Sequence, residues 1–304
     1  MKPASPSLTV SALAAAVLVS AACAGVQDSG PPTPQDAARA AFEEAEETYE
    51  ASNYLEAVRE FQEIKTKHPY SAFAPLAELR LGDCQFEMGK FLEAVEIYRA
   101  FVRFHPHHDR VAYARYRIGE AYYREMPEDW FFMPPAYEKD QAATRDAVRS
   151  LERFLKKHPG DDNEKDAKEM LTSTRRRLAD HEAYVADFYL KRERPGAAAG
   201  RLENLISRYP DVGLAQDALL TLGAIYRDQL MEPDKAYDAF RRLIEMFPND
   251  ERAAAARKAL ETLAPPKSEE APEAPAPPPA DASVPAKPSA PAEAATLKDA
   301  HSES

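Results

Sequence analysis

The chain has 304 residues, with 51 acidic and 39 basic side chains and a formal net charge of −12, which argues against broad phosphate-driven binding of nucleic acid. Glycine is scarce, and the middle of the chain lacks runs of β-branched residues, so the composition favours helices over strands. No nucleotide-binding, zinc-protease or serine-hydrolase motif is present. We therefore expect a protein that is not an enzyme and uses no cofactor.

Residues 1–22 are typical of a signal peptide. Lys2 precedes an apolar stretch of about 12 residues, which is too short to span a bilayer comfortably. Small residues and then Cys23 follow, as in a bacterial lipoprotein signal, although Ser20 stands where that signal prefers Leu. We expect Cys23 to be acylated and to anchor the protein to a membrane. Cleavage by ordinary signal peptidase is the alternative.

Residues 23–36 are small, polar and proline-containing, and they are interpreted as a tether between the anchor and the body. The body, residues 37–264, repeats one pattern: Ala, a large residue four positions later, and Pro eight positions after that. The five occurrences are Ala57-Phe61-Pro69, Ala94-Tyr98-Pro106, Ala147-Leu151-Pro159, Ala198-Leu202-Pro210 and Ala236-Phe240-Pro248. This spacing is typical of the second helix of a tetratricopeptide repeat (TPR). The small Ala permits close helix approach, the large residue fills the gap on the same face, and the Pro ends the hairpin.

Small residues also mark the expected first helices. Gly82 stands 12 residues before Ala94, which is the interval of the repeat, and Gly119 and Gly223 occupy similar places. A glycine inside a helix costs up to about 1 kcal/mol relative to Ala, so its recurrence indicates close helix contact. The sequence thus predicts an all-α fold, a superhelical solenoid of about five TPR-like hairpins.

Two intervals between the prolines are longer than the usual repeat. An insertion of 16 residues between Gly119 and Ala147 contains Trp130, Phe131 and Phe132 among several prolines, and we expect a loop there. These aromatic residues either anchor a partner or pin the loop to its own repeats. Residues 164–191 lack Pro and Gly and keep helical apolar spacing, which predicts one long helix of about seven turns.

Residues 265–304 hold 10 Pro and 11 Ala and few large apolar side chains. Such a segment buries too little surface to offset its ordering entropy, so we expect a disordered tail rich in Pro, Ala and Glu. His105, His107 and His108 lie close together, but His105 occupies the position before Pro that other repeats fill with His, Tyr or Phe, so no metal site is predicted. Cys84 is expected to be a buried free thiol.

The segment from Arg117 to Pro159 resembles the outer-membrane protein assembly lipoproteins of the BamD family, also called ComL or YfiO. That family joins a lipidated cysteine to five TPRs, and its third repeat carries a paired-Phe loop like Phe131-Phe132, followed by spaced Ala, Phe and Pro. The long helix after Pro159 is also similar to the family's entry into repeat four. The resemblance covers roughly residues 37 to 250, whereas the tail is an addition.

The resemblance implies a scaffold of the β-barrel assembly machinery at the outer membrane, lipid-anchored and facing the periplasm. It implies binding to the POTRA domains of a BamA-like barrel protein through the C-terminal repeats, with Arg201 at the contact, and to unfolded outer-membrane proteins through the N-terminal repeats. Trp130, Phe131 and Phe132 are further candidates for partner binding. The alternative is another periplasmic TPR lipoprotein that coordinates cell-envelope or peptidoglycan synthesis and lacks the paired-Phe loop and the long helix.

Overall fold

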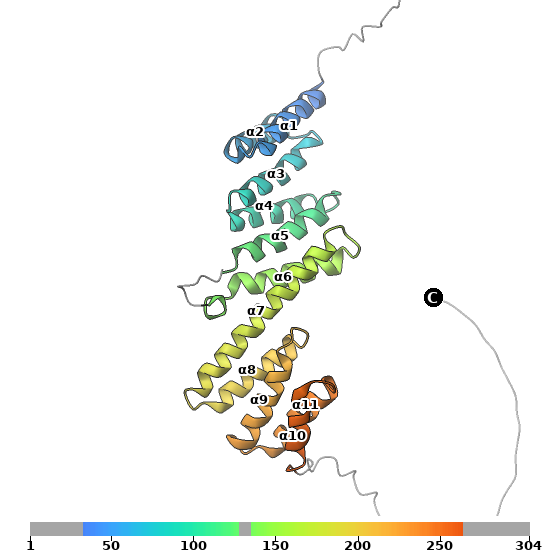
Figure 1. The fold of residues 1–304 in the computed structure, drawn as a ribbon. Coiled ribbons are helices and arrows are strands. Elements are labelled where there is room, and N and C mark those ends of the chain that lie inside the picture. Colours follow the sequence, from blue (N-terminus) through green and yellow to red (C-terminus); the bar gives the residue numbers. More distant parts are fainter. Residues whose placement is uncertain (1–32, 128–134, 264–304) are drawn as a thin grey trace, which may run out of the picture.

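The computed structural model describes residues 33–127 and 135–263, and within these ranges the regular structure is entirely helical (Figure 1). The all-α fold is thereby confirmed. In chain order the helices are α1 (Pro34–Glu50), α2 (Tyr54–Lys67), α3 (Phe73–Glu87), α4 (Phe91–Phe104), α5 (Val111–Glu125), the 3-10 helix η1 (Ala136–Glu138), α6 (Ala142–Lys157), α7 (Glu164–Leu190), α8 (Pro195–Arg208), α9 (Ala215–Asp228), α10 (Pro233–Met246) and α11 (Glu251–Leu260).

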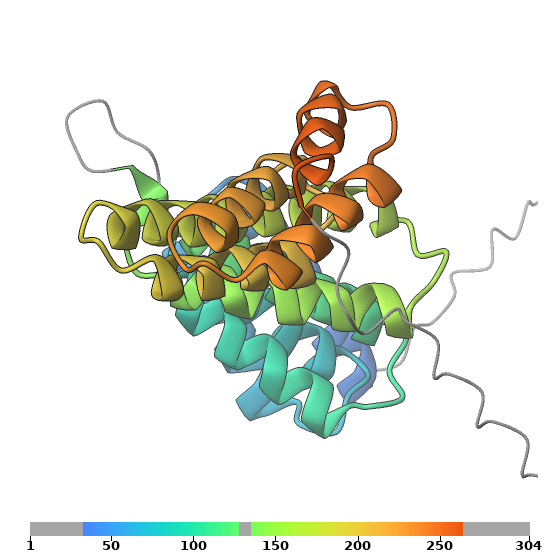
Figure 2. The same ribbon diagram turned by 90° about the horizontal axis from the view of Figure 1, so that it is seen from below.

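The helices pair into five antiparallel hairpins, α1–α2, α3–α4, α5–α6, α7–α8 and α9–α10, and α11 closes the array against α10. Each helix packs mainly on its neighbours in the chain, which is the contact pattern of a solenoid. The hairpins therefore rise in one stack, with the C-terminal hairpins lying over the N-terminal ones when seen from below (Figures 1 and 2). The predicted number of hairpins is confirmed.

The five prolines of the repeat follow the ends of the second helices. The residues before them, which cap these helices, share one backbone conformation, with φ between −123° and −135° and ψ between 49° and 61°. Proline disfavours the helical conformation in the residue before it, so the helix ends there. The sequence motif and the observed boundaries thus have the same physical cause.

Small and large side chains meet as the repeat predicts. The five Ala residues of the motif are completely buried, and the large residues four positions later are at most 5 % exposed. A Cβ added to Gly82 would lie 2.6 Å from the Tyr98 ring, and one added to Gly119 would lie 2.7 Å from Leu151. Gly223 is pressed in the same way against Phe240. The glycines of the first helices therefore receive the large residues of the second helices.

Helix α7 is the long helix that the sequence predicts. Its 27 residues span about 40 Å at 1.5 Å per residue. Its first half packs on α6, and its whole second half continues beyond α6 to pair with α8 (Figure 1). Ala167 belongs to the apolar cluster of α5 and α6, whereas Ala179 and Ala186 belong to the cluster of α8 to α10. One continuous helix thus joins the two parts of the stack.

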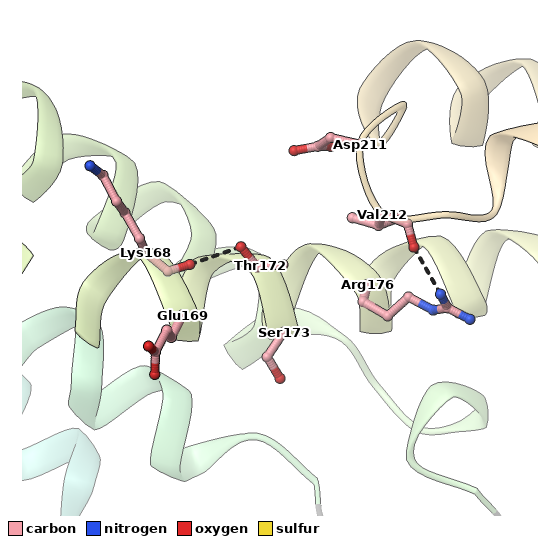
Figure 3. A pocket seen from close by; sticks show the side chains of 7 residues that line it. All are labelled: Lys168, Glu169, Thr172, Ser173, Arg176, Asp211 and Val212. Atoms are coloured by element: carbon pink, nitrogen blue, oxygen red, sulfur yellow. Dashed lines mark hydrogen bonds between the residues drawn. The ribbon is translucent and has the colours of Figure 1, made fainter. Parts of the chain in front are cut away.

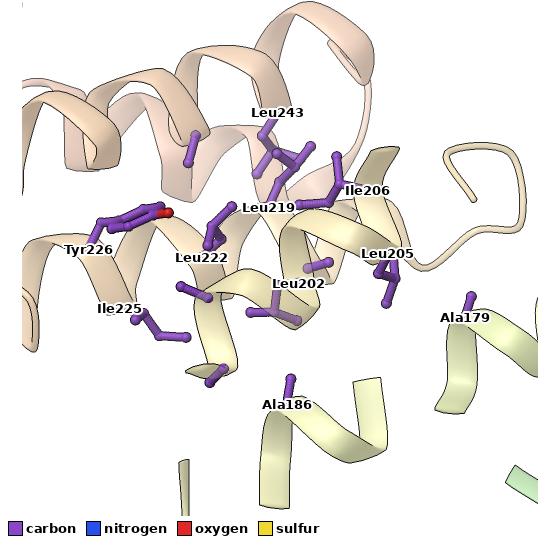
Figure 4. Close-up of a cluster of buried hydrophobic side chains, with 14 of the residues drawn as sticks. Ala179, Ala186, Leu202, Leu205, Ile206, Leu219, Leu222, Ile225, Tyr226 and Leu243 are labelled. Carbon is purple, nitrogen blue, oxygen red and sulfur yellow. The ribbon is translucent and has the colours of Figure 1, made fainter. Parts of the chain in front are cut away.

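The largest apolar cluster lies in the C-terminal part, where Leu202, Leu219, Leu222 and Leu243 meet between α7, α8, α9 and α10 (Figure 4). Three smaller clusters fill the successive interfaces from α1 to α7. At the other end, α1 begins at Pro34, earlier than the predicted start at residue 37, because Thr33 and Asp36 form a capping box. Among the described helices, none has the length and apolar character needed to cross a bilayer.

Candidate functional site

A groove runs across the first helices of the three N-terminal hairpins. Its volume is about 330 Å³, and it is lined by Phe42 and Glu46 of α1, Leu76, Leu79, Arg80 and Asp83 of α3, and Arg110 and Tyr113 at the start of α5. First helices supply this lining because the second helices of the hairpins stand behind them. The lining combines apolar side chains with charged ones in about equal number.

Arg80 forms the charged wall between α1 and α3. Its guanidinium donates to both carboxylate oxygens of Glu46 at 2.6 and 2.7 Å and to Asp83 at 3.0 Å. It also stands over the ring of Tyr49, 5.2 Å from the centroid. A bidentate pair of this kind fixes the relative position of two helices as well as their charge. Arg80 therefore holds the groove in shape and has little capacity left for a ligand.

Asp83 is the centre of a buried polar network beneath the groove. The side chain is fully buried and accepts hydrogen bonds from the hydroxyls of Tyr98 at 2.6 Å and Tyr113 at 2.9 Å. Arg117 lies 3.6 Å from the same carboxylate and also pairs with Glu120 at 3.0 Å. The network links α3, α4 and α5. Its members satisfy one another, as buried charges must.

Burial and the negative charge of Asp83 together raise the pKa values of neighbouring side chains. Burial raises the pKa of the Cys84 thiol to about 12, and the negative charge of Asp83 adds to this effect. The pKa values of Tyr98 and Tyr113 are also raised, first by burial and then by Asp83. Both tyrosines therefore stay protonated and can donate to the carboxylate. Cys84 is a buried free thiol, as expected, and its high pKa makes it a poor nucleophile.

Arg110 stands apart from this network at the rim of the groove. Its side chain is exposed, and within the described ranges no carboxylate lies at ion-pair distance from it. Phe42, Leu76 and Leu79 supply apolar contacts beside it. The groove thus offers an apolar surface and one available guanidinium, which suits a peptide with large apolar side chains and a carboxylate.

A second candidate region lies around the middle of α7, where Arg201 is found. Arg201 projects from α8, and its Nη1 atom lies 3.3 Å from the carboxylate of Glu182 on α7. The Glu182 side chain is 16 % exposed and that of Arg201 is 40 % exposed. The pair joins the two helices of the fourth hairpin and leaves part of the guanidinium open to solvent.

The flanks of the insertion dock on the same stretch of α7. Arg177 donates to the carbonyl oxygen of Pro127, and the Nδ1 atom of His181 lies 2.5 Å from the carbonyl oxygen of Tyr137. The rings of Tyr137 and Tyr184 lie 5.6 Å apart. Residues 177, 181 and 184 share one helix face, next to the face that carries Glu182. The insertion and α8 therefore attach to adjacent faces of α7.

Several predicted site residues fall outside the described ranges, namely Cys23, Trp130, Phe131 and Phe132. The structure places Arg201, and it shows which residues hold the ends of the segment that contains the three aromatic residues. Sequence reasoning missed the roles of Asp83 and His181. For Asp83 a signal was present, because an acidic residue directly after Gly82 falls on the buried side of the helix, beside the expected helix contact.

The hollow beside the first half of α7 has a different character. It is an open depression of about 610 Å³ lined by Lys168, Glu169, Thr172, Ser173, Arg176, Asp211 and Val212 (Figure 3). Arg176 donates to the carbonyl of Val212 at 2.8 Å, and the neighbouring Arg175 contacts Asp211 at 2.9 Å. Glu169 and Ser173 point away from the turn that carries Asp211 (Figure 3). These groups join α7 to the α8–α9 turn and do not converge on a ligand.

Two of the clustered histidines contact neighbouring side chains of the protein. His105 lies 2.8 Å from the carboxylate of Glu78, and the ring of His108 packs on Phe101. Among the residues that the structure covers, no group of three or more His, Cys, Asp or Glu side chains could hold a metal ion.

These features define a class of protein, the solenoids built from stacked helical hairpins. The family model of the outer-membrane lipoproteins named YfiO matches residues 34–239, which is more than half of the chain and covers both candidate regions. The chain belongs to this family, and the family resemblance seen in the sequence is confirmed.

Named relatives share parts of the chain. It is 33 % identical over 88 residues to the outer membrane protein assembly factor BamD of Xylella fastidiosa, a match that covers 29 % of this chain and 30 % of that protein. It is 26 % identical over 174 residues to BamD of Caulobacter vibrioides, covering 57 % and 54 %. Among solved structures, the TPR2AB domain of yeast Sti1 is similar over 74 % of this chain and 84 % of that one, with 16 % identity and a TM-score of 0.37. The chain thus spans from 30 % to about half of the length of these curated relatives.

Proposed function

We propose that the protein is a scaffold subunit of the β-barrel assembly machinery, anchored through acylated Cys23 to the outer membrane and facing the periplasm. The observation that carries this proposal is the family match over residues 34–239. The relatives named as outer membrane protein assembly factors support it. On this proposal the chain catalyses no reaction, and its grooves hold partners in place.

On this proposal each of the two candidate regions binds a different partner. The C-terminal region around Arg201 binds the POTRA domains of a BamA-like barrel protein, and Trp130, Phe131 and Phe132 add anchoring side chains from the insertion. The N-terminal groove receives segments of unfolded outer-membrane proteins, since Phe42, Leu76 and Leu79 offer apolar contacts and Arg110 offers a free charge. Aromatic and arginine side chains supply most of the affinity in interfaces of this kind.

The first experiment is affinity capture of the detergent-solubilised full chain and identification of its partners by mass spectrometry. A barrel protein with POTRA domains is expected as the main partner. Capture of a peptidoglycan synthase without such a barrel would contradict the proposal and favour a role in envelope synthesis.

The role of Arg201 is tested by comparing three variants in the same capture. Arg201→Ala is expected to reduce recovery of the barrel protein at least about tenfold, as loss of a hot-spot arginine does. Glu182→Gln removes the partner of Arg201 within the chain, and Arg59→Ala removes an exposed arginine of α2. Both controls should keep most of the recovery. If Glu182→Gln is as damaging as Arg201→Ala, then Arg201 acts only by holding α7 to α8.

A further inference from the structure

Exposed aromatic residues at one edge of the stack belong neither to the N-terminal groove nor to the region around Arg201. Tyr70, in the turn between α2 and α3, is 100 % exposed, and Phe104, the last residue of α4, is 65 % exposed. Both lie where a second helix ends and the next hairpin begins. Large aromatic side chains exposed to solvent on two successive hairpins are unexpected in a chain that buries the aromatic residues of its repeat motif almost completely.

This edge is also the edge at which the folded body begins. Helices α1 and α2 are antiparallel, so the N-terminus of α1 lies beside the C-terminus of α2, and the α2–α3 and α4–α5 turns lie along the same side of the stack (Figure 1). The chain covers ten residue-to-residue steps from Cys23 to Thr33 and can reach at most about 36 Å when fully extended. An anchor at Cys23 therefore limits the start of α1, at this edge, to within about 36 Å of the bilayer surface.

The positive charge of Arg103, beside these aromatic residues, is suited to contact with lipid phosphates. The Arg103 guanidinium stands over the Phe104 ring, 4.7 Å from the centroid, and no carboxylate lies at ion-pair distance from it in the described part of the chain. Tyr70 combines an apolar ring with a polar hydroxyl. Phe104, with the Arg103 guanidinium stacked on it, combines an apolar ring with a charged group. Side chains of this kind sit at the level of lipid headgroups, where rings contact acyl chains and cations meet phosphates.

We propose that Tyr70, Phe104 and Arg103 form a contact surface for the headgroup region of the bilayer, so that the anchored protein rests on the membrane by this edge. This inference rests on the proposed lipid anchor and not on the proposed partners. Membrane attachment is stronger when two signals combine, so a surface contact would add to the lipid anchor and would also orient the folded body on the bilayer. The groove between α1, α3 and α5 then opens at a defined height above the bilayer.

The test uses tryptophan as a probe of bilayer contact. The chain contains one tryptophan, so Trp130→Phe gives a silent background into which Tyr70→Trp is introduced. The matched control is Leu55→Trp, at a 70 % exposed position at the start of α2 and thus at the opposite end of the same helix. The chain from Cys23 onward is coupled by the Cys23 thiol to a maleimide phospholipid, since Cys84 is buried. The vesicles contain phosphatidylglycerol and phosphatidylcholine brominated on its acyl chains.

Quenching of the tryptophan at position 70 is expected to exceed that at position 55 at least about twofold, with a blue-shifted emission. Adding Phe104→Ser and Arg103→Gln should reduce quenching at position 70 by about half or more. Equal quenching at both positions, or stronger quenching at position 55, would overturn the proposal. Circular dichroism confirms that each variant is folded. Because the anchor is supplied chemically, failed acylation in cells or failed capture of a barrel protein would leave this result unaffected.

Discussion

At the scale of single residues, the contact between a glycine and a large side chain decides how closely each hairpin closes. Gly223 in α9 is pressed against the ring of Phe240, whereas Gly200 in α8 has open space where a Cβ would lie. Both positions lie within helices, so a change to alanine improves helix propensity by about 1 kcal/mol in either case. The two sites therefore separate packing from propensity.

We expect Gly200→Ala to stabilise the protein by about 0.5–1 kcal/mol, and Gly223→Ala to destabilise it by about 1–3 kcal/mol because the added methyl group overpacks the contact. Urea unfolding followed by circular dichroism measures both. Stabilisation by Gly223→Ala to the same extent as by Gly200→Ala would mean that Phe240 does not limit the approach of α9 and α10.

Asp83 is the residue whose charge the N-terminal core requires. Asp83→Asn keeps the shape of the side chain but removes the charge that faces Arg80, Arg117 and two tyrosine hydroxyls. We expect a loss of about 3 kcal/mol, which is typical when one partner of a buried ionic network is removed. The control is Asp109→Asn in the exposed α4–α5 turn, with an expected change within about 0.5 kcal/mol. Equal effects in urea unfolding would contradict the role of the network.

His158 predicts a pH dependence of stability. Burial lowers the pKa of its imidazole, and the nearby charge of Arg115 lowers it further, so the folded protein favours the neutral ring. The unfolded chain titrates near the ordinary value of about 6.5 and takes up the proton first as the pH falls. The stability linked to His158 is thus complete above about pH 6.5 and is lost as the pH falls through this value towards the lower pKa of the folded state.

Replacement of His158 by Tyr, which the fourth hairpin carries at this position as Tyr209, should remove that loss. The urea midpoint of the unchanged protein should fall more than that of the variant between about pH 7.5 and pH 5.5. A variant with the same pH slope as the parent chain would show that His158 does not titrate on unfolding.

At the scale of elements, the middle of α7 serves as the platform for the insertion. Arg177→Ala removes the donor to the carbonyl of Pro127, so we expect faster hydrogen exchange at the amides of η1, which docks on the same helix face. Arg192→Ala, in the turn after α7 and beside Phe188, is the control and should leave η1 unchanged. Mass spectrometry of peptic fragments measures this exchange. Unchanged η1 exchange in Arg177→Ala would mean that Tyr137 and His181 suffice to hold the insertion.

The elements were predictable because their signals are local. In each motif the Ala and the large residue four positions later lie on the same helix face. Each closing Pro disfavours the helical conformation of the residue directly before it. Helix α7 was predicted because nothing in residues 164–190 interrupts it. The Asp83 network was not predicted, since Tyr113 is 30 residues away and only the stacking of hairpins brings the two together. The pairing of Arg201 with Glu182 depends on the same kind of packing, and its contact with a partner stays a prediction.

At the scale of the whole molecule, each hairpin contacts mainly the next hairpin in the chain. The loss of stability caused by a local substitution should therefore extend over a limited number of hairpins. Leu222→Ala opens the largest apolar cluster and should cost about 2–5 kcal/mol. Hydrogen exchange should then lose protection mainly in α8 to α11 and much less in α1 to α4. Phe61→Leu in the first hairpin is the reciprocal variant and should show the reverse pattern. A uniform loss of protection in both variants would indicate a single cooperative unit.

The continuity of α7 has a practical consequence for dissecting the molecule. Ala167 completes the apolar contacts of the preceding hairpin, while Ala179 and Ala186 complete those of the following one. Dividing the polypeptide anywhere along this helix would strip packing from both products at once. Fragments intended to assign a partner to one half should therefore overlap, each retaining residues 164–190 in full. Otherwise a lost interaction would report misfolding and not the location of a contact.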